Sequence, residues 1–381
     1  MADELSFGRK NIEHYYETFD RKTYNLLGLL VDFIGNDEII DFIEQTCSSE
    51  QSYPKYIATI NLYYICRALK NRVFRNAVLD AGLCFPDGMP LIWIGKFLNI
   101  CHKGRVTGAD LLPELIKRKL SREYNIFIFG TTPESAKVAQ KVINENSKSL
   151  KAVGFLSPEI APVEELSKEE YIKKINDSKA DILFISLDSE KAMEWISRNR
   201  GKIKVKFMCV VGAAIDFLSG KKRRAPRWMQ EGGLEWLYRL GQEPLRLWKR
   251  YLNDGILFIG LFFRYLLPYK IFLIKNIPEL SRDKEIRFDK DESGHKVKAR
   301  ISGTMNEFNY SKSKDFFRDL LKSGKHVEID LSSLRMIDNS SLGLLKMFSI
   351  ALKRNNKTLS FAAISKNVMK AMRYNLFAID Q

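Results

Sequence analysis

Residues 84–110 read CFPDGMPLIWIGKFLNICHKGRVTGAD, an apolar run broken by a Pro-Asp-Gly turn. Proline fixes φ and glycine permits positive φ, so the turn is tight and holds Asp87 at the end of a strand. Active-site groups of α/β proteins often lie at such strand-to-helix turns. Arg105 and Thr107 follow just before a helical run, and an arginine beside a helix N-terminus suits a phosphate. From spacing alone, an equally good reading makes Asp87 a helix cap and Arg105 a surface charge.

A family resemblance rests on two motifs of this stretch. PDGMPLIW followed by GRVTGADL resembles the PDG…RVTGPDL signature of the WecG/TagA/CpsF glycosyltransferases (glycosyltransferase family 26), and the match extends in order over residues 26–251. The resemblance implies that Asp87 is the catalytic base. It also implies that Thr59 and Asn61, a Thr-x-Asn pair after a short apolar run, line the substrate pocket. From the residues alone, a helix cap explains this pair equally well.

The first part of the chain alternates apolar, β-rich runs with amphipathic helices. This order predicts an α/β fold with a mainly parallel sheet and helices on both faces, and the resemblance implies that this is a Rossmann-like glycosyltransferase domain. One run, NIFIFG, ends in Gly130 directly before a helix at 134–144. Strand, glycine turn and helix N-terminus together suit a nucleotide, so we assign Gly130 to the substrate site. The signal is weak alone because the chain contains no GxGxxG or P-loop motif.

The chain departs from the family at SLDSEKAMEW, residues 186–195, where relatives usually read GLGSPKQExW. The glutamine that contacts substrate in the family falls on Ala192. Asp188 and Glu190 add carboxylates, which oppose a nucleotide diphosphate unless they point outward or pair with a base such as Lys191. The departure keeps an alternative open: a catalytically weakened member that acts as a regulatory or scaffolding protein at the membrane.

Composition sets further limits. The chain has 381 residues, enough for two domains, and its 62 basic against 46 acidic residues give a net charge of +16. This charge predicts an anionic partner, and no recognition motif supports nucleic acid. The five cysteines are scattered and lack CxxC spacing, so they indicate no disulfide framework and fit a reducing cytoplasm. The four histidines are dispersed, and no metal site is indicated. We therefore expect no cofactor.

Residues 219–251 carry nine basic residues against three glutamates, interleaved with tryptophan and tyrosine. This mixture is typical of a membrane interface. The segment resembles the family's C-terminal appendage, which implies that it closes over the site and that Arg224 and Arg227 contact the substrate diphosphate. Residues 255–274 are long enough to span a membrane but include Arg264 and Lys270, and a charge at a helix centre costs about 2.5–3.5 kcal/mol. An interfacial or re-entrant helix is favoured, with a buried core helix as the alternative.

The C-terminal residues resemble a STAS domain, the small α/β fold of anti-sigma factor antagonists. In that signature a helix begins at a phosphorylatable serine, which falls on Ser340. A helix N-terminus stabilises an added phosphate, whereas the competing reading makes Ser340 a plain N-cap. The domain boundaries that we expect are a disordered lead-in at 1–22, the glycosyltransferase domain at 23–251, a membrane-associating helix at 252–277, a linker at 278–296 and the STAS-like domain at 297–381.

Together these readings imply an inverting, metal-independent enzyme that transfers an N-acetylmannosamine-like sugar. The donor would be a UDP-sugar, and the acceptor a polyprenyl-diphosphate-linked sugar used in cell-envelope polysaccharide synthesis. The enzyme would lie on the cytoplasmic face of the membrane, peripheral or monotopic, and its STAS-like domain would bind a protein partner.

Overall fold

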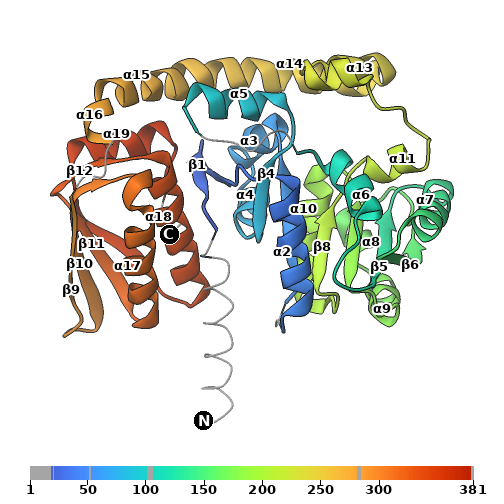
Figure 1. The fold of residues 1–381 in the computed structure, drawn as a ribbon, viewed down its shortest axis with the longest axis horizontal. Coiled ribbons are helices and arrows are strands. Elements are labelled where there is room, and N and C mark those ends of the chain that lie inside the picture. The colour runs from blue at the N-terminus through green and yellow to red at the C-terminus, as the bar shows by residue number, and fades with distance from the viewer. Residues whose placement is uncertain (1–18, 20, 51–52, 101–105, 281–284, 379–381) are drawn as a thin grey trace, which may run out of the picture. The chain divides into compact units, whose positions relative to one another are not determined.

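The computed structural model describes residues 19, 21–50, 53–100, 106–280 and 285–378. Most of the expected lead-in at 1–22 lies outside these residues. The chain divides into two compact units, one of Phe33–Ile256 and one that joins Met1–Asp32 to Leu257–Gln381. Each unit has its own sheet and is described separately (Figure 1).

The unit 33–256 is built on a six-stranded sheet in the order β4-β3-β8-β7-β5-β6. Every neighbouring pair is parallel, as the alternation of strands and helices predicted. Strands β7 and β8 are buried along their whole length, which is typical of a parallel sheet covered on both faces. The strands are β3 (Lys55–Ile60), β4 (Leu83–Pro86), β5 (Tyr124–Gly130), β6 (Leu150–Leu156), β7 (Ile182–Ser186) and β8 (Phe207–Val210).

Helices flank this sheet and supply its core (Figure 1). Trp195 shows how they pack: its side chain is fully buried, stacks at 4.7 Å on Phe129, and donates from Nε1 to the Leu166 carbonyl at 2.9 Å. The helices are α2 (Asn36–Ser48), α3 (Leu62–Ala68), α4 (Arg72–Leu79), α5 (Met89–Phe97), α6 (Gly108–Lys117), α7 (Pro133–Asn146), α8 (Val163–Leu166), α9 (Glu169–Asp177), α10 (Ser189–Asn199), the 3-10 turn η1 (Arg200–Lys202) and α11 (Ala214–Leu218).

The basic segment after α11 is helical. Two short helices, α12 (Arg227–Glu231) and α13 (Glu235–Gln242), lead to a continuous helix at Pro244–Lys275. The long helix comprises α14 (Pro244–Leu261), a π-helical turn η2 (Phe262–Leu266) and α15 (Leu267–Lys275). It is long and apolar enough to cross a membrane, and 17% of its most apolar window is buried. A buried core helix, the alternative reading of this segment, is therefore wrong.

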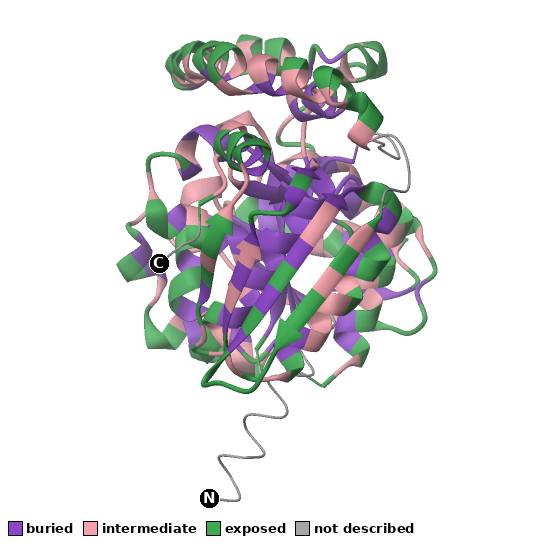
Figure 2. Cartoon of the chain, turned by 90° about the vertical axis from the view of Figure 1, so that its left-hand side faces the viewer, coloured by how far each residue is buried: buried purple, intermediate pink, exposed green. Residues whose placement is uncertain are grey.

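The second unit contains a small α/β fold, as the resemblance to a STAS domain implied. Its sheet has the order β12-β10-β11-β13, with β9 antiparallel on β10. Figure 2 shows exposed and buried residues alternating along the strands that face the viewer. The elements are α16 (Ile277–Leu280), β9 (Ile286–Asp291), β10 (Lys296–Met305), η3 (Glu307–Asn309), α17 (Tyr310–Lys322), β11 (His326–Leu331), β12 (Leu334–Ile337), α18 (Asn339–Arg354), β13 (Leu359–Ile364) and α19 (Lys366–Tyr374).

Two segments differ from the sequence reading. Part of the expected linker at 278–296 is strand β9, because Ile286 and Phe288 alternate with charged residues and Phe288 stacks at 4.4 Å on Phe316. The hairpin β1 (Tyr24–Leu26) and β2 (Leu29–Val31), at the start of the predicted glycosyltransferase domain, has its contacts in the compact unit that contains the C-terminal residues.

Candidate active site

Asp87 lies at the carboxyl edge of the six-stranded sheet, where β3 and β4 end side by side. Its backbone N–H donates to the Ile60 carbonyl at 2.6 Å, which extends the ladder between the two strands by one residue. Gly88 follows with φ +112°, a conformation that favours glycine, and α5 then begins. The Pro-Asp-Gly turn thus forms as predicted and fixes the backbone of Asp87 at the edge where α/β proteins bind ligands.

Thr59 and Asn61 flank the same strand end. Thr59 is 8% exposed, and Asn61 is the N-cap of α3, where its Oδ1 accepts from the Tyr64 N–H at 3.2 Å. The helix-cap reading of Asn61 therefore holds in the structure. The cap places Asn61 one residue beyond Ile60, which accepts the hydrogen bond of Asp87. Both predicted pocket residues thus lie at the same strand end as the candidate base.

Thr107 and Gly108 bring a second helix N-terminus to this edge. Thr107 caps α6, because its Oγ1 accepts from the Asp110 N–H at 3.1 Å and donates to the Asp110 carboxylate at 2.6 Å. A Cβ added to Gly108 would lie 3.3 Å from Thr59 Cγ2, so the first turn of α6 packs tightly on the end of β3. Arg105, the predicted phosphate ligand, lies outside the described residues.

Gly130 makes the turn from β5 to α7. It has φ +96°, and an added Cβ would lie 2.5 Å from the Ser186 carbonyl oxygen, so no other residue fits without rearrangement. The next residue, Thr131, donates from Oγ1 to Asp216 of α11 at 2.7 Å. Lys221 approaches the same turn, with Nζ 3.2 Å from the Thr132 hydroxyl. The turn therefore combines a helix N-terminus with a nearby cation, an arrangement suited to an anion.

The appendage contributes a chain of alternating charges. Arg224 pairs with Asp110 of α6 and lies 3.8 Å from Glu235, and Glu235 pairs with Arg239 at 2.6 Å. Burial alone would lower the pKa of Arg239, but the charges of Glu235 and Asp87 raise it. Asp87 is thus within electrostatic range of an appendage arginine that sequence reasoning did not single out.

The structure separates Arg227 from this group. Its side chain is 90% exposed and pairs with Glu231 at 2.9 Å, one turn along α12. Of the two appendage arginines predicted to contact substrate, only Arg224 joins the charge chain. The sequence could not separate them, since both lie in the same basic run.

Tyr64 is a second residue that sequence reasoning missed. Its side chain is fully buried, and its hydroxyl has no hydrogen bond of normal geometry within the described part of the chain. Burial raises the pKa of Tyr64, the charge of Asp87 raises it further, and the neighbouring Ser189 and Thr59 side chains lower it. A buried phenol without a well-formed hydrogen bond, close to the candidate base and beside Ser189 and Thr59, marks a place where a ligand can bond.

In the segment 186–195, which departs from the family sequence, one added carboxylate is paired and the other points to solvent. Glu190 pairs with Arg67 and accepts hydrogen bonds from Tyr63 at 3.1 Å and Asn71 at 3.3 Å. Asp188 is exposed and caps α10 by accepting from the Lys191 N–H at 3.2 Å. The base that pairs with Glu190 is thus Arg67 on α3, and the suggested partner Lys191 is wrong because its ammonium donates to the Ala161 carbonyl.

Ala192 occupies a packed position. Its side chain is fully buried in the structure, in α10 one turn before Trp195. The methyl group therefore packs in the interior. A methyl group cannot make the polar contact expected of the family's glutamine.

Ser340 of the second unit is also buried. It is 1% exposed, and its hydroxyl donates to Asp338 at 2.8 Å. Asp338 is the N-cap of α18 and accepts from the Ser341 N–H at 2.8 Å, so the reading of Ser340 as the N-cap is wrong. Phosphorylation of Ser340 would require this end of α18 to open.

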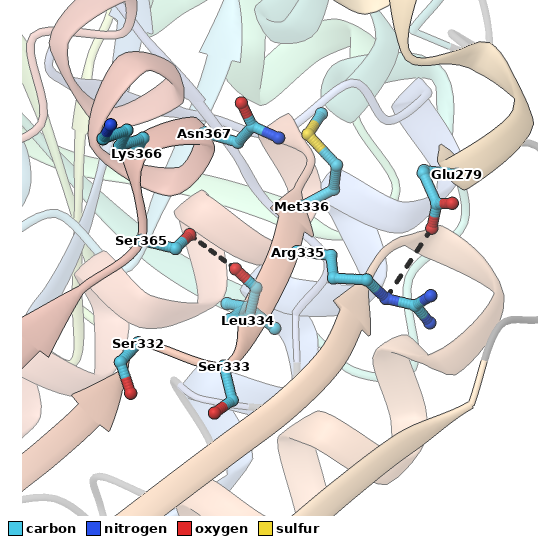
Figure 3. Close-up of a pocket in the computed structure, with 9 residues that line it drawn as sticks. All are labelled: Glu279, Ser332, Ser333, Leu334, Arg335, Met336, Ser365, Lys366 and Asn367. Carbon is cyan, nitrogen blue, oxygen red and sulfur yellow. Dashed lines mark hydrogen bonds and ion pairs between the residues drawn. The ribbon is translucent and has the colours of Figure 1, made fainter.

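The same unit has an open surface pocket of about 480 Å³ beside β12 and the start of α19 (Figure 3). Ser365 caps α19 and donates to the Leu334 carbonyl at 2.5 Å, and Arg335 lies 3.9 Å from Glu279. These polar groups are engaged within the fold itself. The described residues hold no group of three or more His, Cys, Asp or Glu side chains that could bind a metal ion.

Comparison with known proteins gives matches over both units. A family model described as the glycosyl transferase WecG/TagA/CpsF family matches residues 24–271, and one described as "Mlab, STAS domain" matches residues 288–376. Two similar curated proteins are named N-acetylglucosaminyldiphosphoundecaprenol N-acetyl-beta-D-mannosaminyltransferase. The one from Bacillus subtilis (strain 168) is 25% identical over 56% of this chain and 81% of its own length. The one from Staphylococcus aureus (strain MRSA252) is 23% identical over 58% of this chain and 86% of its own length.

A solved structure also matches part of the chain. It is the crystal structure of an antisigma-factor antagonist STAS domain from Rhodobacter sphaeroides, with 19% sequence identity and a TM-score of 0.18. The match covers 24% of this chain and 90% of that one.

Proposed function

Because the chain belongs to the WecG/TagA/CpsF family of glycosyltransferases, we propose that it transfers an N-acetylmannosamine-like sugar to a polyprenyl-diphosphate-linked sugar. The named relatives act on such a lipid-linked acceptor, and the chain covers more than four fifths of the length of each. The donor in this proposal is a UDP-sugar, and the product enters a cell-envelope polysaccharide.

The observation that carries the proposal is the position of Asp87 between a strand-end turn and the appendage charges. In the proposed step, the acceptor hydroxyl oxygen bonds to the anomeric carbon while the bond from that carbon to the UDP oxygen breaks. Asp87 takes the hydroxyl proton, and attack opposite the leaving UDP inverts the anomeric centre. Thr59 and Asn61 orient the substrate in this scheme.

Fixed cations neutralise the charge that develops on the leaving diphosphate. Arg224 and Arg239 lie along the charge chain of the appendage, and Lys221 lies at the Gly130 turn. Arginine binds a diphosphate through two parallel hydrogen bonds and keeps its charge at every physiological pH. We propose that these side chains, together with Arg105, Thr107 and the helix N-termini at this edge, take the place of a metal ion.

Membrane attachment belongs to the same proposal, because the acceptor is a lipid. The helix 244–275 presents apolar side chains to solvent and carries basic residues beside them. Such a helix binds a membrane surface through apolar burial and attraction to anionic headgroups. We propose that the enzyme works on the cytoplasmic face, and that its STAS-like domain binds a protein partner.

The test is release of UDP from UDP-N-acetylmannosamine, with and without a lipid-linked acceptor in mixed micelles. Release that depends on the acceptor, with the sugar recovered on the lipid, supports the proposal. Binding of the donor without turnover would instead favour the regulatory alternative. The internal pairing of Glu190 with Arg67 removes one reason for that alternative, because the added carboxylate is already neutralised.

A further inference from the structure

The N-terminal hairpin is attached to the C-terminal unit by specific contacts. Its strands β1 and β2 are at most 7% exposed. The Asn25 side chain donates to the Asn375 carbonyl at 2.8 Å, just after α19, and the Tyr310 hydroxyl donates to the Arg21 carbonyl at 3.1 Å. Lys22 forms an ion pair with Glu307. Segments from opposite ends of the chain are therefore joined in one compact unit.

Gly343 shows how closely the hairpin approaches α18. A Cβ added to this glycine would overlap the Thr23 carbonyl oxygen and lie within 3.0 Å of Tyr24 Cα. Gly343 stands inside a helix, where glycine weakens the helix relative to alanine. Its presence is explained by the backbone of residues 23–24, which lies against the helix at this position.

The interface under the hairpin is polar and poorly satisfied. Three side chains have polar atoms buried without a hydrogen-bond partner in the described ranges: Thr23 Oγ1, Asn25 Oδ1 and both polar atoms of Asn339. Buried polar groups normally find partners, and those that do not reduce the stability of the contact. The first turn of α18 therefore presents the Asn339 amide, which another binding partner could satisfy better than the hairpin does.

We propose that residues 21–31 are a displaceable internal occupant of a protein-docking face, formed by the first turns of α18 and the chain just after α19. While the hairpin is bound, the face is closed and Ser340 is inaccessible. When the hairpin leaves, the face becomes available to another protein. The proposal concerns the second unit alone and does not depend on the glycosyltransferase chemistry.

Gly343→Ala in the full chain tests the proposal. Alanine is the better helix former, so without a docked hairpin the substitution would only strengthen α18. With the hairpin docked, the added methyl should expel it and make the amides of residues 24–31 exchange with deuterium at least about tenfold faster. Strands β10, β11 and β13 should keep their protection. Gly260→Ala is the matched control, since that helical glycine has no atom within 4 Å of an added Cβ.

A second variant disturbs the contact between the hairpin and α18 by a change in the hairpin. Leu26→Glu places a charge on a fully buried hairpin residue and leaves α18 unchanged. Both variants should release residues 24–31 alone and increase trypsin cleavage at Arg21 and Lys22. Unchanged exchange in Gly343→Ala would overturn the docking. Loss of protection across the whole unit in both variants would also overturn the proposal, since the hairpin would then be a fixed part of the fold.

Discussion

Asp87 is the residue on which the proposed chemistry depends most directly. Asp87→Asn keeps the size of the side chain and the backbone hydrogen bond to Ile60, but it removes the proton acceptor. Loss of a general base costs on the order of 10²–10⁴ in rate, so turnover should fall by that factor while UDP still binds. Asp80→Asn, at the end of α4, is the control and should retain turnover. Near-normal turnover in Asp87→Asn would remove Asp87 from the mechanism.

The two adjacent tyrosines of α3 should respond in opposite ways to loss of the hydroxyl. Tyr64→Phe removes a buried hydroxyl whose contacts with Ser189 and Thr59 miss normal hydrogen-bond geometry, so the unfolding free energy should rise by about 1–3 kcal/mol. If that hydroxyl bonds to substrate or to Asp87 during reaction, kcat/KM should fall about 10–100-fold at the same time.

Tyr63→Phe is the matched control for this pair. Burial and the charge of Glu190 raise the pKa of Tyr63 to about 12, and its hydroxyl donates to Glu190 at 3.1 Å. Its loss should lower stability by about 1 kcal/mol and leave kcat/KM nearly unchanged. Thermal melts of both variants measure the change in stability, and initial rates measure the change in kcat/KM. A stabilised Tyr64→Phe with normal kcat/KM would show that the hydroxyl has no part in the reaction.

At the scale of elements, the helix at 244–275 is the part of the chain that we propose attaches the protein to a membrane. Its exposed apolar residues recur every three or four positions through α14 and η2, so they form one stripe. They are Leu245, Trp248, Leu252, Ile256, Ile259 and Phe263, each at least 45% exposed. An apolar stripe along one side of the helix favours a helix lying in the interface over one that spans the bilayer.

Ile256→Glu tests this stripe. An apolar side chain contributes about 1.5–3 kcal/mol when fully buried, so binding to anionic vesicles should weaken at least about tenfold. Ile160→Glu makes the same chemical change at an isoleucine that is 99% exposed and lies outside the helix. Co-sedimentation with vesicles should separate the two variants. Equal binding of both would place the attachment elsewhere on the chain.

Elements with a strong local pattern could be predicted from the sequence. The continuous apolar runs predicted the buried parallel strands, and the Pro-Asp-Gly motif predicted the turn at Asp87. What could not be predicted depends on distant partners. Glu190 pairs with Arg67, 123 positions away, and the β1–β2 hairpin joins α18 from the opposite end of the chain. Strand β9 was hidden because only two apolar residues alternate within a charged run.

Within the candidate site, too, contacts with residues distant in the sequence could not be predicted. The motifs were enough to predict that Thr59, Asn61 and Thr107 lie at the candidate site. Arg224 and Arg227 have the same local sequence context, and only their ion-pair partners, Asp110 and Glu231, distinguish them. Tyr64 carried no signal in the sequence, because a tyrosine in an amphipathic helix is usually a core residue. Its interest comes from a buried hydroxyl without a well-formed hydrogen bond close to Asp87, which only coordinates can reveal.

At the scale of the whole molecule, two compact units predict two thermal transitions, because each has its own sheet and core. Only the unit 33–256 contains the candidate site, so a ligand of that site should stabilise that unit alone. UDP at 100 times its Kd adds about 2.7 kcal/mol, and a unit of this size gains about 2–4 °C in Tm per kcal/mol. One transition should therefore rise by about 5–11 °C in scanning calorimetry. ADP is the control and should move neither transition by a comparable amount. A joint shift of both transitions would show that the units unfold together, and a shift of the other transition alone would assign the nucleotide to the STAS-like unit.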